Sequence, residues 1–97
     1  MAYEIEFVAS ARRQLDALPV PQRTRIVAAI EEQLSHEPLV ETRNRKPLRS
    51  NPVATWELRI RKARVFYDVE GSAKVTILAI GIKKGNRLYI EGREIQL

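Results

Sequence analysis

The stretch from Trp56 to Val69 constrains the fold more than any other part of the chain. Apolar and charged residues alternate along it, which predicts two antiparallel strands joined by a turn at Arg61-Lys62. Three apolar pairs then face one another on one side of the hairpin: Ile60 with Ala63, Leu58 with Val65, and Trp56 with Tyr67. On the other side Arg59 lies opposite Arg64, and like charges placed directly across a ladder are destabilising. We therefore expect a polyanion to offset that cost and predict a phosphate-binding site on this face.

The size and composition of the chain narrow the classes of protein it can belong to. Its 97 residues predict one domain over 1–97 with a single modest core. The absence of cysteine excludes a disulfide, a thiolate metal site and a cysteine nucleophile. No apolar run approaches the ~20 residues that cross a bilayer, and the segment Met1–Glu4 has no basic n-region. We therefore expect a cytoplasmic protein without membrane contact.

Positive charge is concentrated in the second half of the chain. Residues 1–42 hold four Lys and Arg against seven Asp and Glu, whereas residues 43–97 hold thirteen against five. A basic region of this kind is typical of a protein that meets nucleic acid. The alternative is a solvated basic surface without a partner.

The hydrophobic pattern predicts a strand, two helices and then three antiparallel strands. The expected elements are, in order, a strand over 3–8, a helix from Ser10 as N-cap to Pro19, a helix from Pro21 to Pro38, an irregular stretch over 39–53, strands over 54–60, 63–69 and 74–80, and a basic loop over 83–86. Residues 88–97 form either one more strand pair that turns at Glu91-Gly92 or a short helix. The helices are expected to pack on one face of the sheet in a two-layer α+β domain.

The face of the sheet away from the helices is expected to stay exposed. Strand parity predicts five side chains on it: Glu57, Arg59, Arg64, Phe66 and Asp68. Arg61 and the basic loop at Lys83 and Lys84 are expected nearby.

Several segments of the chain have the order and spacing found in a known family, and together they span nearly the whole chain. They are Tyr3-Glu4-Ile5-Glu6-Phe7, Leu15-Asp16-Ala17-Leu18, Lys46-Pro47-Leu48, Trp56-Glu57-Leu58-Arg59-Ile60, Arg64-Val65-Phe66-Tyr67-Asp68-Val69 and Ile77-Leu78-Ala79-Ile80-Gly81. In these the chain resembles the RelE/ParE superfamily of toxins from bacterial type II toxin–antitoxin systems. The resemblance implies a RelE-like fold and neutralisation by a cognate antitoxin protein.

The resemblance implies one of two activities. RelE-like members are ribosome-dependent endoribonucleases that cut mRNA, whereas ParE-like members share the fold and inhibit DNA gyrase without nuclease chemistry. A third alternative is a non-toxic fold relative that only binds an antitoxin. We favour the RelE-like branch, with the ribosome and mRNA as partners, operator DNA contacted only through the antitoxin, and no cofactor.

The site residues that the resemblance implies are basic side chains on the sheet face and a late tyrosine. Arg59 matches a strand lysine or arginine, Arg64 matches the arginine that opens the third strand, and Lys83 follows Gly81 where a basic residue is common. Tyr89 falls where the late tyrosine sits. Two features depart from the pattern: Glu57 replaces a lysine, and residues 87–97 do not read as the usual C-terminal helix.

Cleavage by attack of the 2′-hydroxyl on the adjacent phosphate assigns roles to these residues. Arg64 and Arg59 suit the phosphate, because an arginine fork is always protonated and matches two phosphate oxygens. Lys83 adds a third positive group, or serves as acid or base. Glu57 is either a general base or a salt-bridge partner of the arginines. Tyr89 stacks on a base, donates a proton, or is only a half-buried aromatic.

Further residues are expected to bind RNA without taking part in the chemistry. The basic members of this set are Arg61, Lys62, Lys84, Arg45, Lys46 and Arg49. Phe66 is either a stacking platform for a base or is packed beneath the C-terminal segment. The single histidine, His36, is expected to lie far from this face, and one histidine without cysteine leaves too few ligands for a metal site.

Overall fold

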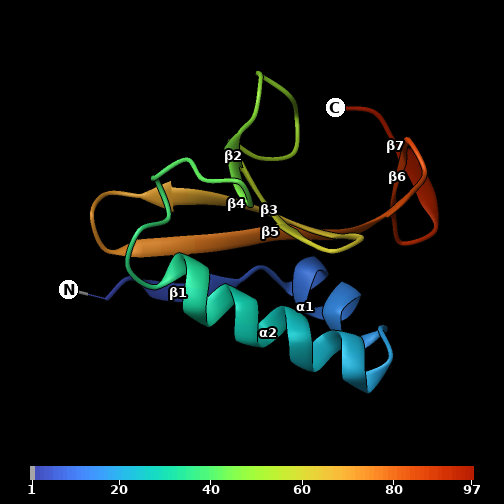
Figure 1. The fold of residues 1–97 in the computed structure, drawn as a ribbon, viewed down its shortest axis with the longest axis horizontal. Helices are drawn as coiled ribbons and strands as arrows, with labels where there is room; N and C mark the ends of the chain where they lie inside the picture. Colours follow the sequence, from blue (N-terminus) through green and yellow to red (C-terminus); the bar gives the residue numbers. More distant parts are fainter. Residues whose placement is uncertain (1) are drawn as a thin grey trace.

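Two helices and seven strands form two layers in residues 2–97, the part of the chain that the computed structural model describes. In chain order the elements are β1 (Glu4–Phe7), α1 (Ala9–Asp16), α2 (Val20–Leu34), β2 (Arg45–Pro47), β3 (Trp56–Ile60), β4 (Ala63–Glu70), β5 (Lys74–Lys84), β6 (Arg87–Ile90) and β7 (Arg93–Ile95). Both helices lie on one face of the sheet, below it in Figure 1. The predicted α+β architecture is confirmed.

The central hairpin has the register that the alternating sequence predicts. Arg59 lies opposite Arg64, and the three expected apolar pairs are formed in β3 and β4. The turn is made by Arg61 and Lys62, and Arg61 adopts the left-handed conformation with φ of 55°. The two guanidinium groups are therefore neighbours on one face of the sheet.

Strand β5 pairs with β4 from Lys74 to Ile82 but changes partner on its other edge. Its first part pairs with β1 in parallel, up to Phe7 with Ile77, and its last part pairs with β6 from Ile82 onward. Between these partners the Ile80 N–H donates to Oε1 of Gln14, a buried side chain of α1, at 2.8 Å. Gln14 thus satisfies a backbone donor that no strand reaches.

The main core fills the space between the helices and the sheet. Ile26, Ile30 and Leu34 of α2 pack there against the inward-facing residues of β3, β4 and β5. Tyr67 is fully buried in this layer, and its hydroxyl donates to the Pro38 carbonyl at 2.6 Å. Its ring stacks on Trp56, with 6.2 Å between the centroids. The hydrogen bond from Tyr67 to Pro38 fixes the loop after α2 to the centre of the sheet.

A second, smaller core covers part of the opposite face, which was expected to stay exposed. Phe66 is 0% exposed and packs with Ala54, Ala79 and Leu88. The loop between β2 and β3 and the hairpin of β6 and β7 rise from this face and supply the cover (Figure 1). The assignment of Phe66 as a stacking platform for RNA is therefore wrong, because no ring surface is accessible.

Asp68 also has a structural role on this face. Its Oδ1 accepts hydrogen bonds from both the backbone N–H and the hydroxyl of Thr55, each at 2.7 Å. The loop that covers Phe66 is held to β4 by this contact.

The C-terminal segment forms the strand pair rather than the helix. Glu91 and Gly92 make its turn with φ of 53° and 77°, as in a hairpin turn that needs two left-handed residues. Gly81 allows β6 to approach β5, since a Cβ there would lie 2.8 Å from Leu88 Cδ1 and 3.1 Å from the Tyr89 carbonyl oxygen.

Four details differ from the expectation. The stretch predicted to be irregular contains the short strand β2, which pairs with β3. Lys83 and Lys84 extend β5 instead of lying in a loop, because β6 supplies their hydrogen-bonding partners. Val8, not Ser10, is the N-cap of α1, and α2 ends at Leu34, well before Pro38.

Neither helix in residues 2–97 is long and apolar enough to cross a membrane.

Candidate functional site

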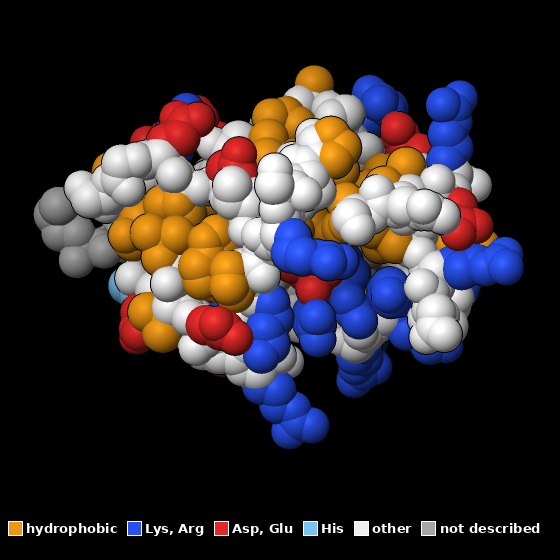
Figure 2. Space-filling model, turned by 90° about the horizontal axis from the view of Figure 1, so that it is seen from above, with side chains coloured by type: hydrophobic (Ala, Val, Ile, Leu, Met, Phe, Trp, Pro, Cys, Tyr) orange, Lys and Arg blue, Asp and Glu red, His pale blue; other side chains and the backbone are white. Residues whose placement is uncertain are grey.

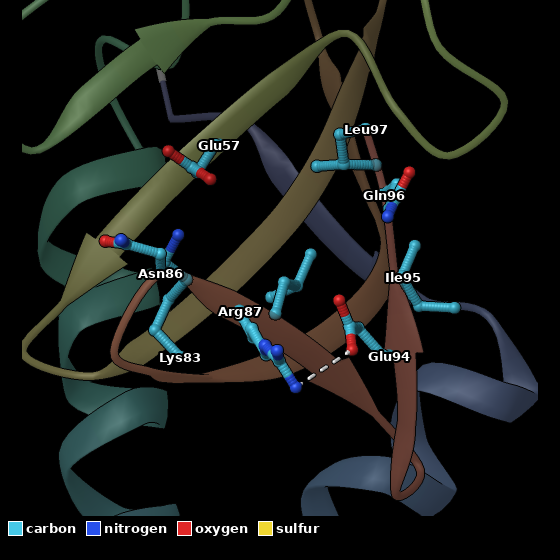
Figure 3. Close-up of a pocket in the computed structure, with 9 residues that line it drawn as sticks. Glu57, Lys83, Asn86, Arg87, Glu94, Ile95, Gln96 and Leu97 are labelled. Carbon is cyan, nitrogen blue, oxygen red and sulfur yellow. Dashed lines mark ion pairs between the residues drawn. The ribbon is translucent and has the colours of Figure 1, made fainter.

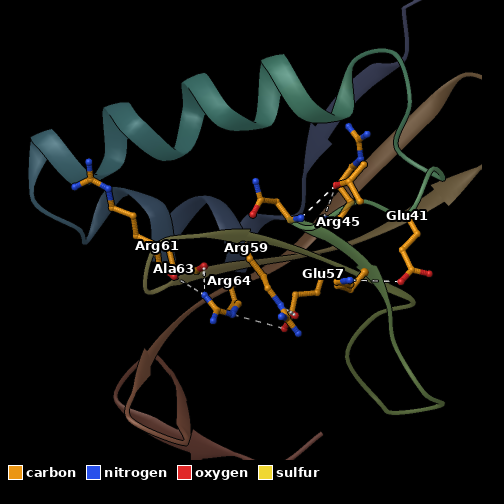
Figure 4. A network of polar contacts seen from close by, with 10 residues as sticks. Glu41, Arg45, Glu57, Arg59, Arg61, Ala63 and Arg64 are labelled. Atoms are coloured by element: carbon orange, nitrogen blue, oxygen red, sulfur yellow. Dashed lines mark hydrogen bonds and ion pairs between the residues drawn. The ribbon is translucent and has the colours of Figure 1, made fainter.

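The paired arginines are joined by a buried carboxylate. Glu57 is 7% exposed; its Oε2 accepts a hydrogen bond from Arg59 Nε at 2.7 Å, and its Oε1 lies 4.0 Å from Arg64 Nε. Figure 4 shows the three side chains directed toward one another. The repulsion predicted between the arginines is thus offset within the protein itself, in part by Glu57.

Arg64 is the more firmly held of the two arginines. Its Nη1 donates to the carbonyl oxygens of Arg61 and Ala63, at 2.7 and 2.9 Å, and its side chain is 16% exposed. Burial lowers the pKa of Arg64; the Glu57 carboxylate opposes this shift and the Arg59 charge adds to it. An arginine nevertheless remains protonated in a protein. Arg64 is therefore a fixed cation whose position does not depend on a ligand.

A cleft of about 290 Å³ adjoins these groups between the sheet face and the C-terminal hairpin. Glu57 and Lys83 line the inner wall, which belongs to the sheet, and Arg87 and Glu94 line the outer wall, which belongs to the C-terminal hairpin of β6 and β7 (Figure 3). Lys83 is held in β5 by pairing with Leu88 and by its N–H, which donates to the Lys62 carbonyl at 2.7 Å. The cleft brings a carboxylate and a lysine of the predicted set together.

Other basic residues surround this face. Seen from the side away from the helices, Lys and Arg side chains gather over the centre and right of the molecule (Figure 2). Lys46 shares the face of Glu57 across the β2–β3 ladder, and its Nζ lies 3.5 Å from Glu41 Oε2. Arg49 and Lys62 are exposed. These three residues are available to a polyanion, so their role in binding RNA stays a prediction.

Arg61 and Lys84 are turned away from the cleft. Figure 4 shows the Arg61 side chain directed toward the start of α2, where it lines a separate depression with Arg25 and Ile26. The Lys84 ammonium lies 5.4 Å from the centre of the Tyr89 ring. Neither residue is brought to the arginine pair.

Arg45 was predicted to bind RNA, and its position contradicts this. The residue is 9% exposed; its Nε donates to the Val40 carbonyl at 3.0 Å, and its Nη1 donates to the Gln33 carbonyl and side chain at 2.6 and 3.2 Å. These contacts tie β2 to the end of α2. Arg45 is a structural residue.

Replacing Arg45 by Met should therefore affect stability and not RNA binding. The variant leaves the carbonyls of Val40 and Gln33 without their donor, which we expect to lower the free energy of unfolding by about 2–3 kcal/mol. Urea denaturation measures this loss. Arg43→Met, an exposed change in the same loop, is the matched control and should stay within about 0.5 kcal/mol. Equal stability of the two variants would contradict the structural role.

Tyr89 is not brought together with the other predicted catalytic residues. It pairs with Ile82, which packs on the helix side, whereas Lys83 pairs with Leu88 in the second core. Cross-strand partners share a face, so Tyr89 and Lys83 point to opposite sides of the ladder. Tyr89 does not line the cleft, so the structure does not bring it to Lys83, and its catalytic role stays a prediction.

Sequence reasoning missed the outer wall of the cleft. Asn86, Arg87, Glu94 and Gln96 line it; Glu94 and Gln96 come from residues 88–97, whose structure the sequence left open, and Asn86 comes from the predicted basic loop. The turn residues Gly85-Asn86 and Glu91-Gly92 were the available signal, because two turns so close together require a short strand pair. Nothing in the local pattern indicates that this pair folds over the sheet.

His36 is exposed beyond the end of α2 and takes no part in the cleft. Within residues 2–97, no three His, Cys, Asp or Glu side chains are grouped closely enough to hold a metal ion.

The comparisons with known proteins place the chain in a family. The model of the family described as phage-derived protein Gp49-like (DUF891) matches residues 13–96, and the chain belongs to this family. Its structure is similar to a chain of the crystal structure of the toxin–antitoxin complex RelBE2 from Mycobacterium tuberculosis, with a TM-score of 0.73 and 31% sequence identity over 86% of this chain and 93% of that chain. No functionally curated protein matches. The resemblance to RelE-like toxins is thereby confirmed.

Proposed function

We propose that this protein is the toxin of a type II toxin–antitoxin system and that it cleaves mRNA on the ribosome. The family and the structural neighbour support the toxin class. The nuclease activity is supported by one observation above all. Glu57, which is ion-paired with Arg59 and Arg64, lines a cleft together with Lys83 on the helix-free face of the sheet.

The reaction that fits these groups is attack of a ribose 2′-oxygen on the neighbouring phosphorus. The P–O2′ bond forms and the P–O5′ bond breaks, which leaves a 2′,3′-cyclic phosphate and a 5′-hydroxyl. Arg64 and Arg59 stabilise the charge that develops on the phosphate oxygens, a contribution that fixed donors make most effectively. Glu57 receives the 2′-hydroxyl proton, and the Lys83 ammonium gives a proton to the leaving 5′-oxygen.

Glu57 can serve as the base because each of its oxygens has more than one lone pair. The hydrogen bond from Arg59 uses one direction on Oε2, Arg64 approaches Oε1 only to 4.0 Å, and the residue also lines the cleft. The same ion pairs orient the arginines. The Glu57 carboxylate is therefore proposed to have two roles, as the base and as the ion-pair partner, and a single substitution can distinguish them.

Replacing Glu57 by Gln tests which role matters. The amide oxygen still accepts the Arg59 hydrogen bond but cannot take a proton, so we expect the cleavage rate to fall about 10²–10⁴-fold and the acid limb of the pH–rate profile to disappear. A single-turnover assay over a pH series measures both. A rate within about tenfold of wild type, with the acid limb intact, would assign Glu57 to ion pairing alone.

The proposed partners follow from the proposed class. The antitoxin is a protein that neutralises the toxin, as the structural neighbour is a toxin–antitoxin complex. The ribosome and mRNA would meet the basic side chains around the cleft, where contacts to phosphate supply affinity without reading sequence. Arg49 and Lys62 are exposed members of that set, and Lys46 is half-buried beside Glu41.

Controlled expression of the intact chain tests the proposal. Cleavage of mRNA within codons, mapped by primer extension and repeated in a purified translation system with and without ribosomes, is the expected result. Cleavage should require ribosomes. Intact mRNA together with damaged DNA and filamentous cells would identify a gyrase inhibitor instead, and normal growth would identify a non-toxic relative.

A further inference from the structure

The outer wall of the cleft carries one cation and one carboxylate side by side. Nη1 of Arg87 lies 3.8 Å from Oε1 of Glu94 (Figure 3), too far for a hydrogen bond. The two side chains are 68% and 40% exposed, and such ion pairs contribute little to stability. Each group can therefore leave the other for a ligand at small cost.

We propose that this wall holds one unpaired RNA base and that Arg87 and Glu94 select guanine. The inference rests on the proposed ribonuclease function and adds the base that the enzyme reads. Arg59, Arg64 and Lys83 bind the phosphate whatever the sequence, whereas the hairpin determines where cleavage occurs.

The hydrogen-bonding pattern of guanine matches this pair of side chains. Guanine presents two adjacent donors on its Watson–Crick edge, N1–H and the N2 amino group, while adenine, cytosine and uracil each present one. The Glu94 carboxylate is acceptor-only and has two oxygens for these donors. Arginine is the usual partner of guanine O6 and N7. Because O6 is next to N1, a cation and a carboxylate must lie side by side, as they do here.

The size and lining of the cleft fit a single base. Its volume of about 290 Å³ is at the lower end of small-ligand pockets. Leu88 and Ile95, which are cross-strand partners, both line it, and Leu88 is buried beneath in the second core. Lys83 and Glu57 lie at the other side, where the phosphate is assigned. Sequence-specific reading of RNA uses unpaired bases held in this way.

Cleavage mapping on a library of coding sequences tests the inference. Ribosomes translate mRNAs that contain all codons, and the cut ends are sequenced. Wild-type cuts should cluster next to guanine. Glu94→Gln, which replaces one acceptor oxygen by a donor, should reduce the preference for guanine about tenfold or more while total cleavage changes little. Arg87→Ala should act in the same direction.

Two matched variants control for loss of charge. Arg93→Ala lies on the same hairpin but outside the cleft, and Glu70→Gln lies at the distant end of β4. Both should keep the wild-type preference. An unchanged preference in Glu94→Gln, or a loss of cleavage that is equal for all sequences, would overturn the inference.

Nucleotide binding to the isolated protein separates this inference from the proposed function. Titrations with 5′-GMP, 5′-IMP and 5′-AMP are followed by NMR shifts of the Asn86, Arg87 and Glu94 amides. GMP should bind several-fold more tightly than IMP, which lacks the N2 amino group, and than AMP. A protein that cleaves no RNA but prefers GMP refutes the function and keeps the inference. A nuclease that binds the three equally keeps the function and overturns the inference.

Discussion

Replacing Arg64 by Ala should abolish growth arrest while the protein remains folded. The guanidinium is held by two backbone carbonyls and approached by Glu57, so it is a preorganised donor for a phosphate that gains charge. Loss of one such donor costs about 10²–10³-fold in rate. We expect mRNA cleavage to fall by at least that factor, measured by primer extension in the translation system.

Folding and charge are controlled separately in this experiment. Circular dichroism and thermal unfolding show whether the variant is native. Arg64→Lys keeps the charge without the fork and should recover part of the activity. Arg12→Ala removes an exposed arginine of α1 and should remain fully toxic. A folded and fully toxic Arg64→Ala protein would exclude Arg64 from the site.

Replacing Phe66 by Ala should produce the largest loss of stability among the changes considered. The ring is fully buried against Ala54, Ala79 and Leu88, so truncation leaves a cavity beneath the covering loop. Such substitutions cost about 3–5 kcal/mol, a large share of the 5–15 kcal/mol that typically stabilises a domain. Urea denaturation should show a much lower midpoint.

Phe66→Leu distinguishes a core residue from a stacking residue. Leucine fills much of the same space, so we expect a folded protein that has lost only about 1–1.5 kcal/mol and cleaves mRNA at a near-normal rate. If the ring stacked on RNA, the Leu variant would keep its stability and lose cleavage. That result would reinstate the role first predicted from strand parity.

Features determined by local periodicity could be predicted from the sequence. The register of β3 and β4 follows from alternation over 56–69, since a one-residue slip would turn every apolar side chain to the wrong face. The helix α2 follows from its apolar stripe and from Pro21 in the first turn. Because the same register places Arg59 beside Arg64, the arginine pair of the candidate site could be predicted together with the hairpin.

Features that depend on distant contacts could not be predicted. Phe66 alternates with the polar residues Arg64 and Asp68 of β4, yet residues 48–54 and 88–95 cover it. Arg45 looks like its exposed neighbours in a basic loop, and only the end of α2, more than ten residues earlier, makes it structural. Arg87 and Glu94 meet in the cleft because β6 and β7 pair and fold over the sheet.

Gly81 has a consequence for the evolution of this family. Its missing side chain is what admits β6 so close to β5, because a Cβ there would lie 2.8 Å from Leu88 Cδ1 and 3.1 Å from the Tyr89 carbonyl oxygen. A homologue with a larger residue at this position must shift the Leu88 and Ile90 side chains and the Tyr89 carbonyl, and so must hold its outer wall differently. Position 81 is thus a marker by which homologues that share this cleft can be separated from those that share only the sheet.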